Sequence, residues 1–367
     1  MRRSVIVIFC IAILLSCSKK DPAHSAGNPL KMHTEVLLRT TPVKNQGNSD
    51  LCWIYAMLAT IETEHIMRGD SLELSAAYMT RHLLADEASR LYAQGDAPIT
   101  TRGMITMTLS LLNLHGAMPH TSYRMPENVD LKSLPLQIQR IAKSHHAHPK
   151  GITSLEKNIN QVLDETLGPV PSWVFMLGCE YTPLEFAHSL FSKGEYTALT
   201  SFTHHPFGHR FVLEVPDNHY HDSFLNVPLD SMMNYIDHSL RTGHPVCWEG
   251  DISEPGFLFK EGKATLDKKQ GKVTQEERQH GFDHKKTTDD HCMEMIGIAH
   301  DNQGKKYYIC KNSWGKENPY NGLMYMDENY ARAKTIAVVL PSATLPDMDR
   351  IAGEKKNEDI NITIPLP

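Results

Sequence analysis

The sequence has no cluster of basic residues beyond its first three positions, no internal repeat and no low-complexity tract. Its formal net charge is −6, so it lacks the electrostatic footprint of a nucleic-acid-binding protein, and no nucleic-acid partner is expected. A hydrophobic content of 41% and a charged content of 22% over 367 residues are typical of an ordinary globular protein. That length is sufficient to bury a full core in two lobes or in one enlarged domain.

A CxxC pair is also missing. The sequence has seven cysteines, of which two lie in the N-terminal segment and the rest are Cys52, Cys179, Cys247, Cys292 and Cys310. An odd number at wide spacing matches neither a disulfide framework nor a zinc site. The unpaired thiol needs another explanation, and a catalytic nucleophile is one.

Metal-binding patterns are absent as well, although the chain has 21 histidines. The groups at 145–148, 204–209 and 219–221 have no helix-face spacing such as HExxH and no acidic partner at a fixed offset. We therefore expect solvated or loop histidines, no metal site and no cofactor.

The N-terminus has the features of a targeting segment. Arg2 and Arg3 precede an apolar run, 5–15, that is too short for a stable transmembrane helix, and Ser16 then precedes Cys17. A small residue before a cysteine at this place resembles a bacterial lipobox. The resemblance implies a signal peptide at 1–16 and acylation of Cys17. It also implies an exported protein anchored to a membrane at the periplasmic or cell-surface face. The alternative is a plain secretory signal in which Cys17 has no role.

Helical and strand patterns occupy different parts of the chain. Apolar residues recur at helical spacing in the segments 51–67, 74–92, 103–115, 131–143, 154–166 and 183–192. Short segments rich in β-branched and aromatic residues follow at 196–203, 209–215, 245–249, 291–299, 306–312 and 322–327, with one helical stretch at 228–242. This order predicts an α+β fold with two lobes within 41–341, mainly 41–192 and 193–341.

Three polar segments are predicted to lie outside the regular elements. Residues 17–40 are expected to be a lipid-anchored linker, 252–288 a long exposed loop, and 342–367 a C-terminal arm punctuated by prolines.

Cys52 is the first candidate for chemistry. It follows a turn-forming loop, 44–50, and lies in the first turn of the predicted helix. Unpaired N–H groups and the positive end of the helix dipole favour a thiolate there and lower the pKa of the thiol. Gln46, on the preceding loop, could direct its side-chain amide at an oxyanion beside the sulfur. The alternative is a buried structural cysteine.

His291 and Asn312 are the second and third candidates. His291 begins one predicted strand, and Asn312 ends the next. A hairpin with a four-residue loop at 300–303 places these two residues opposite each other on one face. An amide oxygen that accepts from the ring N–H fixes the tautomer and leaves the other ring nitrogen to meet a thiolate. Trp314 is placed to shield this hydrogen bond from water.

The same register also makes a prediction about the neighbouring residue Cys292. It puts Cys292 on the face opposite His291, so a disulfide between Cys292 and Cys310 is not expected. Asp289 and Asp290, directly before His291, have two interpretations that stay open. They either raise the pKa of the imidazole through their charge or only cap the end of a loop.

The pattern of Gln46, five residues, Cys52 and Trp53, then a distant His291 and finally Asn312 within Asn-Ser-Trp-Gly, resembles the papain-like cysteine peptidases. The resemblance implies a helical lobe and a β-barrel-like lobe with the active-site cleft between them. It also implies peptide substrates, with Cys52 as nucleophile, His291 as base and Asn312 as the residue that orients the base. Gln46 would hold the oxyanion, and no cofactor is needed.

Segments 163–168, 181–186, 225–230 and 243–248 resemble the bleomycin hydrolase/aminopeptidase C branch of these peptidases. The long interval between the cysteine and the histidine agrees with its helical insertion. This resemblance implies an aminopeptidase whose C-terminal arm blocks part of the cleft, and a homo-oligomer, a hexamer in that branch. Leu51 departs from the branch, which usually has a basic or small residue before the cysteine, and members of the branch are usually soluble and intracellular.

Two alternatives stay open. The first keeps the chemistry but makes the protein an endopeptidase or a hydrolase of small amides. The second is an inactive surface-anchored binding protein on the same fold. Its signature would be loss of the cysteine, the histidine or the asparagine, and none of these is lost.

Overall fold

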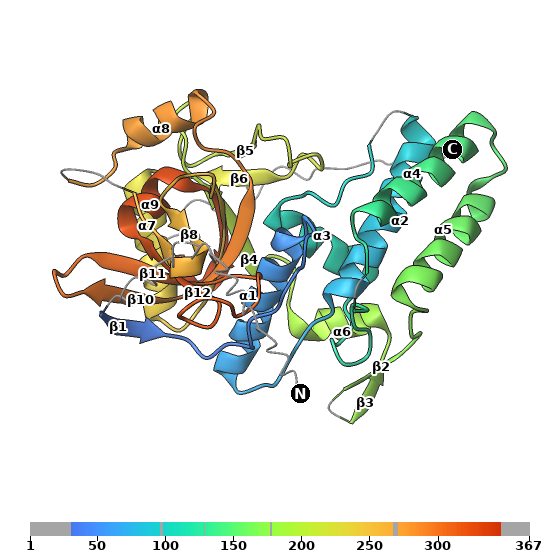
Figure 1. Ribbon diagram of the computed structural model, residues 1–367, viewed down its shortest axis with the longest axis horizontal. Helices are drawn as coiled ribbons and strands as arrows, with labels where there is room; N and C mark the ends of the chain where they lie inside the picture. Colours follow the sequence, from blue (N-terminus) through green and yellow to red (C-terminus); the bar gives the residue numbers. More distant parts are fainter. Residues whose placement is uncertain (1–30, 96–97, 128, 177, 267–270, 346–367) are drawn as a thin grey trace, which may run out of the picture.

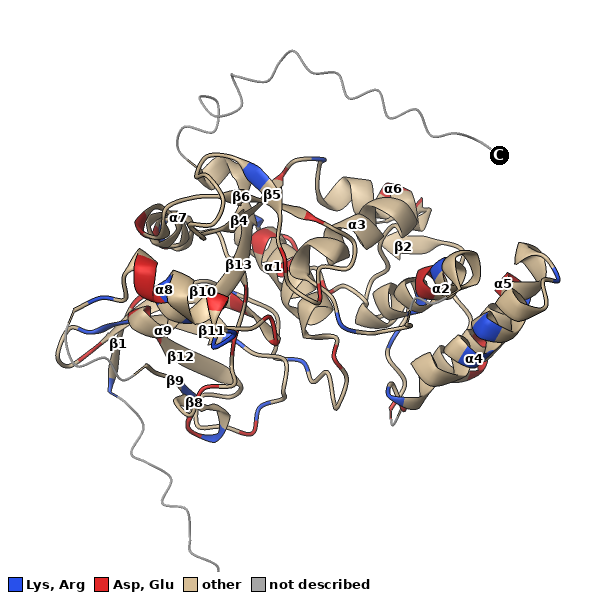
Figure 2. Ribbon diagram, turned by 90° about the horizontal axis from the view of Figure 1, so that it is seen from above, with Lys and Arg blue, Asp and Glu red and all other residues tan. Residues whose placement is uncertain are grey.

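The computed structural model describes residues 31–345 except 96–97, 128, 177 and 267–270. The predicted signal peptide, the lipid-attachment residue Cys17 and nearly all of the predicted C-terminal arm therefore lie outside the described residues. Figure 1 shows a group of helices on one side and a large mixed sheet on the other, and Figure 2 shows the same division from a second direction. The fold is α+β, with a helical lobe beside a lobe built on the sheet.

The helical lobe contains the six helices that the apolar spacing predicts, with ends that differ from the prediction by a few residues. They are α1 (Cys52–Arg68), α2 (Ala76–Gln94), α3 (Ile105–His115), α4 (Ser133–Ala147), α5 (Ile152–Leu167) and α6 (Pro183–Leu190). Helix α1 ends at Gly69, whose φ of 104° is in the left-handed region that favours glycine. A small hairpin, β2 (Val174–Met176) and β3 (Cys179–Tyr181), leads into α6. Among the described residues, no helix has the length and apolar character needed to cross a bilayer.

The second lobe is built on one sheet with the strand order β5-β6-β4-β13-β7-β10-β11-β12-β9-β8, and β1 pairs with β10. The central strands are β4 (Tyr196–Thr200), β13 (Thr335–Pro341), β7 (Val246–Gly250), β10 (His291–Asp301), β11 (Lys306–Lys311) and β12 (Leu323–Asp327). The outer strands are β1 (Met32–Leu37), β5 (Arg210–Val212), β6 (Ser223–Asn226), β8 (Phe257–Leu258) and β9 (Lys263–Ala264). Helices α7 (Leu229–Arg241), α8 (Gln275–Asp283) and α9 (Glu328–Lys334) complete this lobe.

Alternate residues of the central strands face two different hydrophobic cores. Cys247 and Cys292 pack in the core that contains α1, whereas Trp248 and Met293 pack in the core that contains α7. Side chains alternate between the faces of a sheet, so β7 and β10 separate the two cores. Cys310 lies in the α7 core, and it and Cys292 are free thiols, so the prediction that they do not form a disulfide is confirmed.

The predictions for two segments expected to be irregular are wrong. The segment predicted as a linker, 17–40, contains strand β1, which pairs with β10 from Met32 opposite Asp301 to Leu37 opposite Gly297. The segment 252–288, predicted as a long exposed loop, contains β8, β9 and α8, and Arg278 of α8 is 1% exposed. Both segments are polar, and their structure comes from pairing with distant parts of the chain, which local hydrophobic patterns do not report.

The predicted hairpin register is also wrong. Ala299 pairs with Tyr307 where the four-residue loop required Gly304, and a bulge lies between Met295 and Gly297. The described ladder ends at Glu294 opposite Lys311, so His291 and Asn312 are not a cross-strand pair. Turn residues alone did not fix the loop length, because Asp301 and Gly304 fit a longer turn equally well.

Candidate active site

Cys52 is the first residue of α1 and is partly buried at the boundary between the lobes. No side chain caps the start of this helix, so its first N–H groups are free to face an anion. The preceding loop is shaped by Gly47, whose φ is 64° and whose N–H donates to Asn45 Oδ1 at 2.9 Å. A reactive thiol therefore lies at the positive end of a helix, as the sequence predicts.

His291 and Asn312 are in direct contact even though the strand register differs from the prediction. His291 Nε2 donates to Asn312 Oδ1 at 2.9 Å, and the N–H of Ser313 donates to the same oxygen at 2.7 Å. The Trp314 ring lies 4.6 Å from the imidazole, and His291 is 3% exposed. The predicted contact between His291 and Asn312 is confirmed. This tautomer leaves Nδ1 without the proton and able to act as a base.

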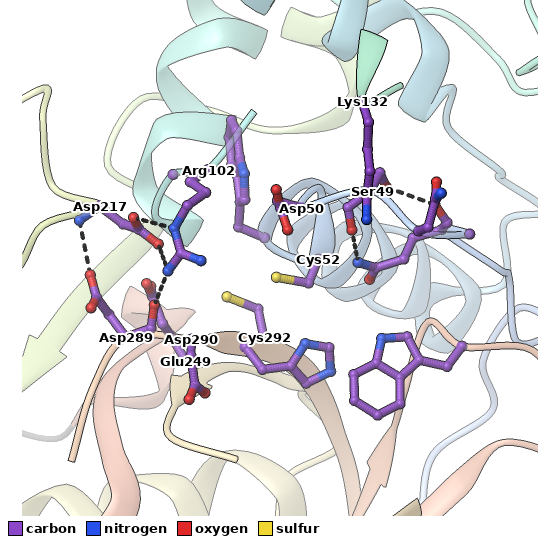
Figure 3. A pocket seen from close by; sticks show the side chains of 17 residues that line it. Ser49, Asp50, Cys52, Arg102, Lys132, Asp217, Glu249, Asp289, Asp290 and Cys292 are labelled. Atoms are coloured by element: carbon purple, nitrogen blue, oxygen red, sulfur yellow. Dashed lines mark hydrogen bonds and ion pairs between the residues drawn. The ribbon is translucent and has the colours of Figure 1, made fainter. Parts of the chain in front are cut away.

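The environment of Cys52 favours the thiolate. Hydrogen bonding from the Cys292 thiol is the largest cause that lowers the pKa of Cys52 well below its ordinary value, and hydrogen bonding and charge from His291 add to it. Burial acts in the opposite direction. Figure 3 shows the sulfur atoms of Cys52 and Cys292 facing each other. A low thiol pKa at this place is the property that a cysteine nucleophile needs.

Both the nitrogen and the oxygen of the Gln46 side-chain amide form hydrogen bonds. Its Nε2 donates to the carbonyl of Ser49 at 2.6 Å, and its Oε1 accepts from Ser313 Oγ at 2.6 Å. The backbone N–H of Gln46 also donates to Ser313 O at 2.8 Å. Because Oε1 is occupied, the NH₂ group is fixed toward the cysteine loop, with one hydrogen left for a further acceptor. This geometry fits an oxyanion donor.

A cavity of about 320 Å³ opens beside Cys52, and we call it the Cys52 pocket. Its lining includes Gln46, Cys52, His291, Cys292 and Trp314, and also the charged residues Asp50, Arg102, Lys132, Asp217, Glu249, Asp289 and Asp290. Figure 3 shows residues of both lobes around it. The nucleophile, the base and a strongly acidic surface therefore share one cavity.

The two aspartates before His291 each hold a neighbouring loop. Asp289 Oδ2 accepts from the N–H of Asp217 at 2.9 Å, and Asp290 Oδ1 accepts from the N–H of Ile252 at 2.8 Å. Of the two interpretations of Asp289 and Asp290, a change in the imidazole pKa and the capping of a loop, loop capping accounts for the hydrogen bonds of both carboxylates.

The sequence patterns do not place Arg102, Asp217, Glu249 or Cys292 in the site. Arg102 and Asp217 are far from Cys52 in sequence and reach the pocket from loops before α3 and after β5. For Glu249 a signal existed, since it is the acidic residue at the end of the buried strand Val246–Gly250. A buried acid in a core strand is unusual enough to mark a functional candidate.

One group of described residues has donors close enough for a metal ion, namely His204, His205 and Glu214. Both imidazoles contact the carboxylate, at 3.2 Å from His204 Nε2 and 2.6 Å from His205 Nε2. The Glu214 side chain is 54% exposed. Hydrogen bonding among the three side chains explains their closeness, and we assign no metal to them.

The fold and the arrangement of Cys52, His291 and Asn312 are those of a papain-like cysteine peptidase. The sequence pattern of the Peptidase C1-like family matches residues 177–364, about half of the chain, and the protein belongs to this family. The protein is therefore a cysteine peptidase of the papain-like class.

Two relatives match most of the chain. Aminopeptidase E from Lactobacillus helveticus is 22% identical over an alignment of 389 positions, which covers 88% of this chain and 86% of that protein. The crystal structure of PepW from Lactobacillus rhamnosis HN001 superposes with a TM-score of 0.68 at 17% identity and covers 90% of this chain and 86% of that one. The match in structure supports the papain-like fold across both lobes.

Proposed function

We propose that the protein hydrolyses peptide bonds through a thioester on Cys52. The thiolate attacks the scissile carbonyl carbon, and the oxyanion that forms accepts hydrogen bonds from Gln46 Nε2 and the Cys52 N–H. The imidazolium of His291, which carries the proton taken from the Cys52 thiol, then protonates the leaving amine, and the carbon–nitrogen bond breaks. Water, deprotonated by His291, hydrolyses the thioester and releases the acid and the thiolate. The observation that carries this assignment is the 2.9 Å hydrogen bond from His291 to Asn312 beside a thiol of lowered pKa.

We further propose that the protein is an aminopeptidase. The aminopeptidase E relative aligns over nearly the whole of both chains, so the likeness is not confined to the catalytic residues. The family pattern also extends to residue 364, which includes most of the predicted C-terminal arm, 342–367. In the branch that the sequence resembles, this arm limits the number of substrate residues before the cut.

Paired fluorogenic amides test this proposal. We expect kcat/KM for a free-amine substrate such as leucyl-aminomethylcoumarin to exceed that for its N-acetyl form by at least tenfold. Truncation after Leu345 is expected to reduce the preference, and Cys52→Ala to abolish both activities. Equal hydrolysis of free and blocked substrates by the intact protein would favour an endopeptidase. Activity only on small amides would favour an amidase.

Membrane anchoring through Cys17 is also a proposal, supported by the order of basic, apolar and small residues before this cysteine. A Cys17→Ser variant should move from the membrane to the soluble fraction and should lose incorporation of labelled fatty acid, without loss of peptidase activity. A wild-type protein that carries no acyl group would contradict the proposal. Assembly into a hexamer is an expectation from the branch that the sequence resembles, and sedimentation velocity measures it.

A further inference from the structure

The charges of the Cys52 pocket are unevenly distributed. Asp217, Glu249 and Asp289 gather on one side of Cys52, whereas Lys132 lies on the other side (Figure 3). Arg102 lies among the acidic residues, but its guanidinium is already bound to Asp217 by two contacts, at 2.8 Å from Nε and 2.7 Å from Nη2. Its Nη2 also donates to the Asp289 carbonyl at 3.2 Å. The positive charge of Arg102 is thus paired with Asp217, and three other carboxylates remain on this side, those of Glu249, Asp289 and Asp290.

Glu249 is the most deeply buried carboxylate of the pocket. It is 1% exposed, and in the register of β7 and β10 it lies directly opposite Cys292. Cross-strand partners project from the same face, so Glu249 shares with Cys292 the face that borders the pocket. Its Oε2 accepts from the N–H of Ile105 at 3.2 Å. Its Oε1 has no hydrogen bond, and no cation pairs with the carboxylate within the described part of the chain.

A structural role for Glu249 accounts for only one of its oxygens. Ile105 is the first residue of α3, so Oε2 satisfies a free N–H at a helix N-terminus. The remaining oxygen has no partner among the described residues, and other anions line the same pocket. Burial raises the pKa of Glu249 well above its usual range, and the charges of Asp289, Cys52 and Asp217 raise it further. An unpaired buried carboxylate is costly, and a ligand that brings a positive charge removes that cost.

The chemistry of an aminopeptidase substrate supplies such a charge at the right place. When the scissile carbonyl lies over the Cys52 sulfur, the α-ammonium nitrogen is separated from the carbonyl carbon by two bonds, roughly 2.5 Å. Glu249, Asp289 and the Cys52 thiol line the same cavity. An ammonium group held near the sulfur is therefore within reach of the same carboxylates.

We propose that Glu249, with Asp289 beside it, forms a cation subsite in the Cys52 pocket that binds the ammonium group of the substrate. The inference rests on the proposed peptidase function and deepens it, because it assigns recognition of the free amine to residues of the pocket itself. A lysine or arginine side chain of the substrate offers the same chemistry as the α-ammonium, and the substrates of the test distinguish the two sources.

The test compares Glu249→Gln with wild type on three amides of aminomethylcoumarin at pH 8: leucyl, N-acetyl-leucyl and N-acetyl-lysyl-leucyl. Glutamine keeps an oxygen for the Ile105 N–H and removes the charge. We expect the ratio of kcat/KM for the leucyl substrate to that for the N-acetyl-leucyl substrate to fall at least tenfold. A fall confined to the lysyl substrate identifies a side-chain cation as the ligand. Ratios unchanged for both cationic substrates overturn the proposal.

Glu165→Gln is the matched control, because it removes the same charge from the exposed face of α5, at the far end of the helical lobe (Figures 1 and 2). It should leave all ratios at their wild-type values. Asp289→Asn is the second variant, and we expect a smaller change in the same direction. Its amide oxygen can still accept from the Asp217 N–H, so the loop contact is retained.

A second readout needs no hydrolysis. Cationic aminoethyl methanethiosulfonate and neutral methyl methanethiosulfonate both modify thiolates, and mass spectrometry of the peptide containing Cys52 gives the two rate constants. The subsite predicts that Glu249→Gln lowers the cationic-to-neutral rate ratio at least fivefold. If wild type hydrolyses none of the amides, the peptidase proposal fails while this ratio still decides the subsite. An unchanged ratio overturns the subsite even if the amides are cleaved.

Discussion

Asn312 shows how a single side chain sets the state of the base. Its Oδ1 accepts from both His291 Nε2 and the Ser313 N–H, and its Nδ2 contacts Met324 Sδ at 3.6 Å. The amide is therefore fixed on both sides, and the imidazole is held in one tautomer and one orientation. Such a residue acts through the base, and Asn312 does not line the Cys52 pocket.

Asn312→Ala is expected to lower kcat by about tenfold to a thousandfold, while KM changes by less than about threefold. The reason is that the imidazole loses its fixed orientation while the pocket keeps its lining. Steady-state kinetics on the free-amine substrate measure both constants, and thermal unfolding verifies that the variant is folded. A change in KM alone would place Asn312 outside the catalytic group.

The residues of the site differ in how far they could be predicted from the sequence. Cys52, Gln46 and Asn312 lie in short motifs in which neighbouring residues identify the chemistry, so the pattern alone places them. Glu249 could be marked as a candidate, but its role could not be predicted, because that role depends on the pairing of β7 with β10 and on the approach of α3. When the role of a residue depends on contacts between lobes, the sequence gives only one signal for it, namely an acidic residue within an apolar strand.

At the scale of elements, local patterns predicted the helices well and the strand pairing poorly. Helices α1 to α6 follow apolar spacing that is contained within each segment. The register of β10 with β11 depends on the length of the turn and on a bulge at Met295 and Gly297, which the turn residues do not determine. His291 still meets Asn312, because Asn312 follows the last paired residue of β11 and its side chain reaches the imidazole.

Strand β1 gives an element-scale prediction. Gly297 of β10 lies opposite Leu37, and a methyl group added to it would overlap the Val36 carbonyl oxygen. Gly297→Ala should therefore displace β1 and lower the free energy of unfolding by about 1–3 kcal/mol. Urea denaturation measures the change. Gly281→Ala in α8, where the added methyl meets only the Thr287 side chain, is the control. Equal stability of the two variants would mean that β1 adds little to the fold.

At the scale of the whole molecule, the pocket places carboxylates between two lobes, where burial opposes their ionisation. Burial, together with the charge of Asp217, raises the pKa of Asp289 to about 6, although the Asp217 N–H and Arg102 act in the opposite direction. The charge of Asp289 also contributes to the raised pKa of Glu249 on β7. A binding surface made of such groups costs stability in the free protein, so function and stability are opposed at this boundary.

The pH dependence of this cost is the last prediction. Because the pKa of Asp289 is raised in the folded protein, its contribution to stability is fully present below about pH 4, the range of an unperturbed aspartate, and is lost as the pH rises through about 6. Asp289→Asn removes the titration and keeps an acceptor for the Asp217 N–H. We therefore expect the variant to exceed wild type in unfolding free energy by about 1–3 kcal/mol at pH 8 and to match it at about pH 3.5. Calorimetry at both pH values measures the difference. Glu165→Gln, which alters an exposed charge, should show no such pH-dependent gain. A gain of equal size at both values would assign the effect to packing and not to the buried charge.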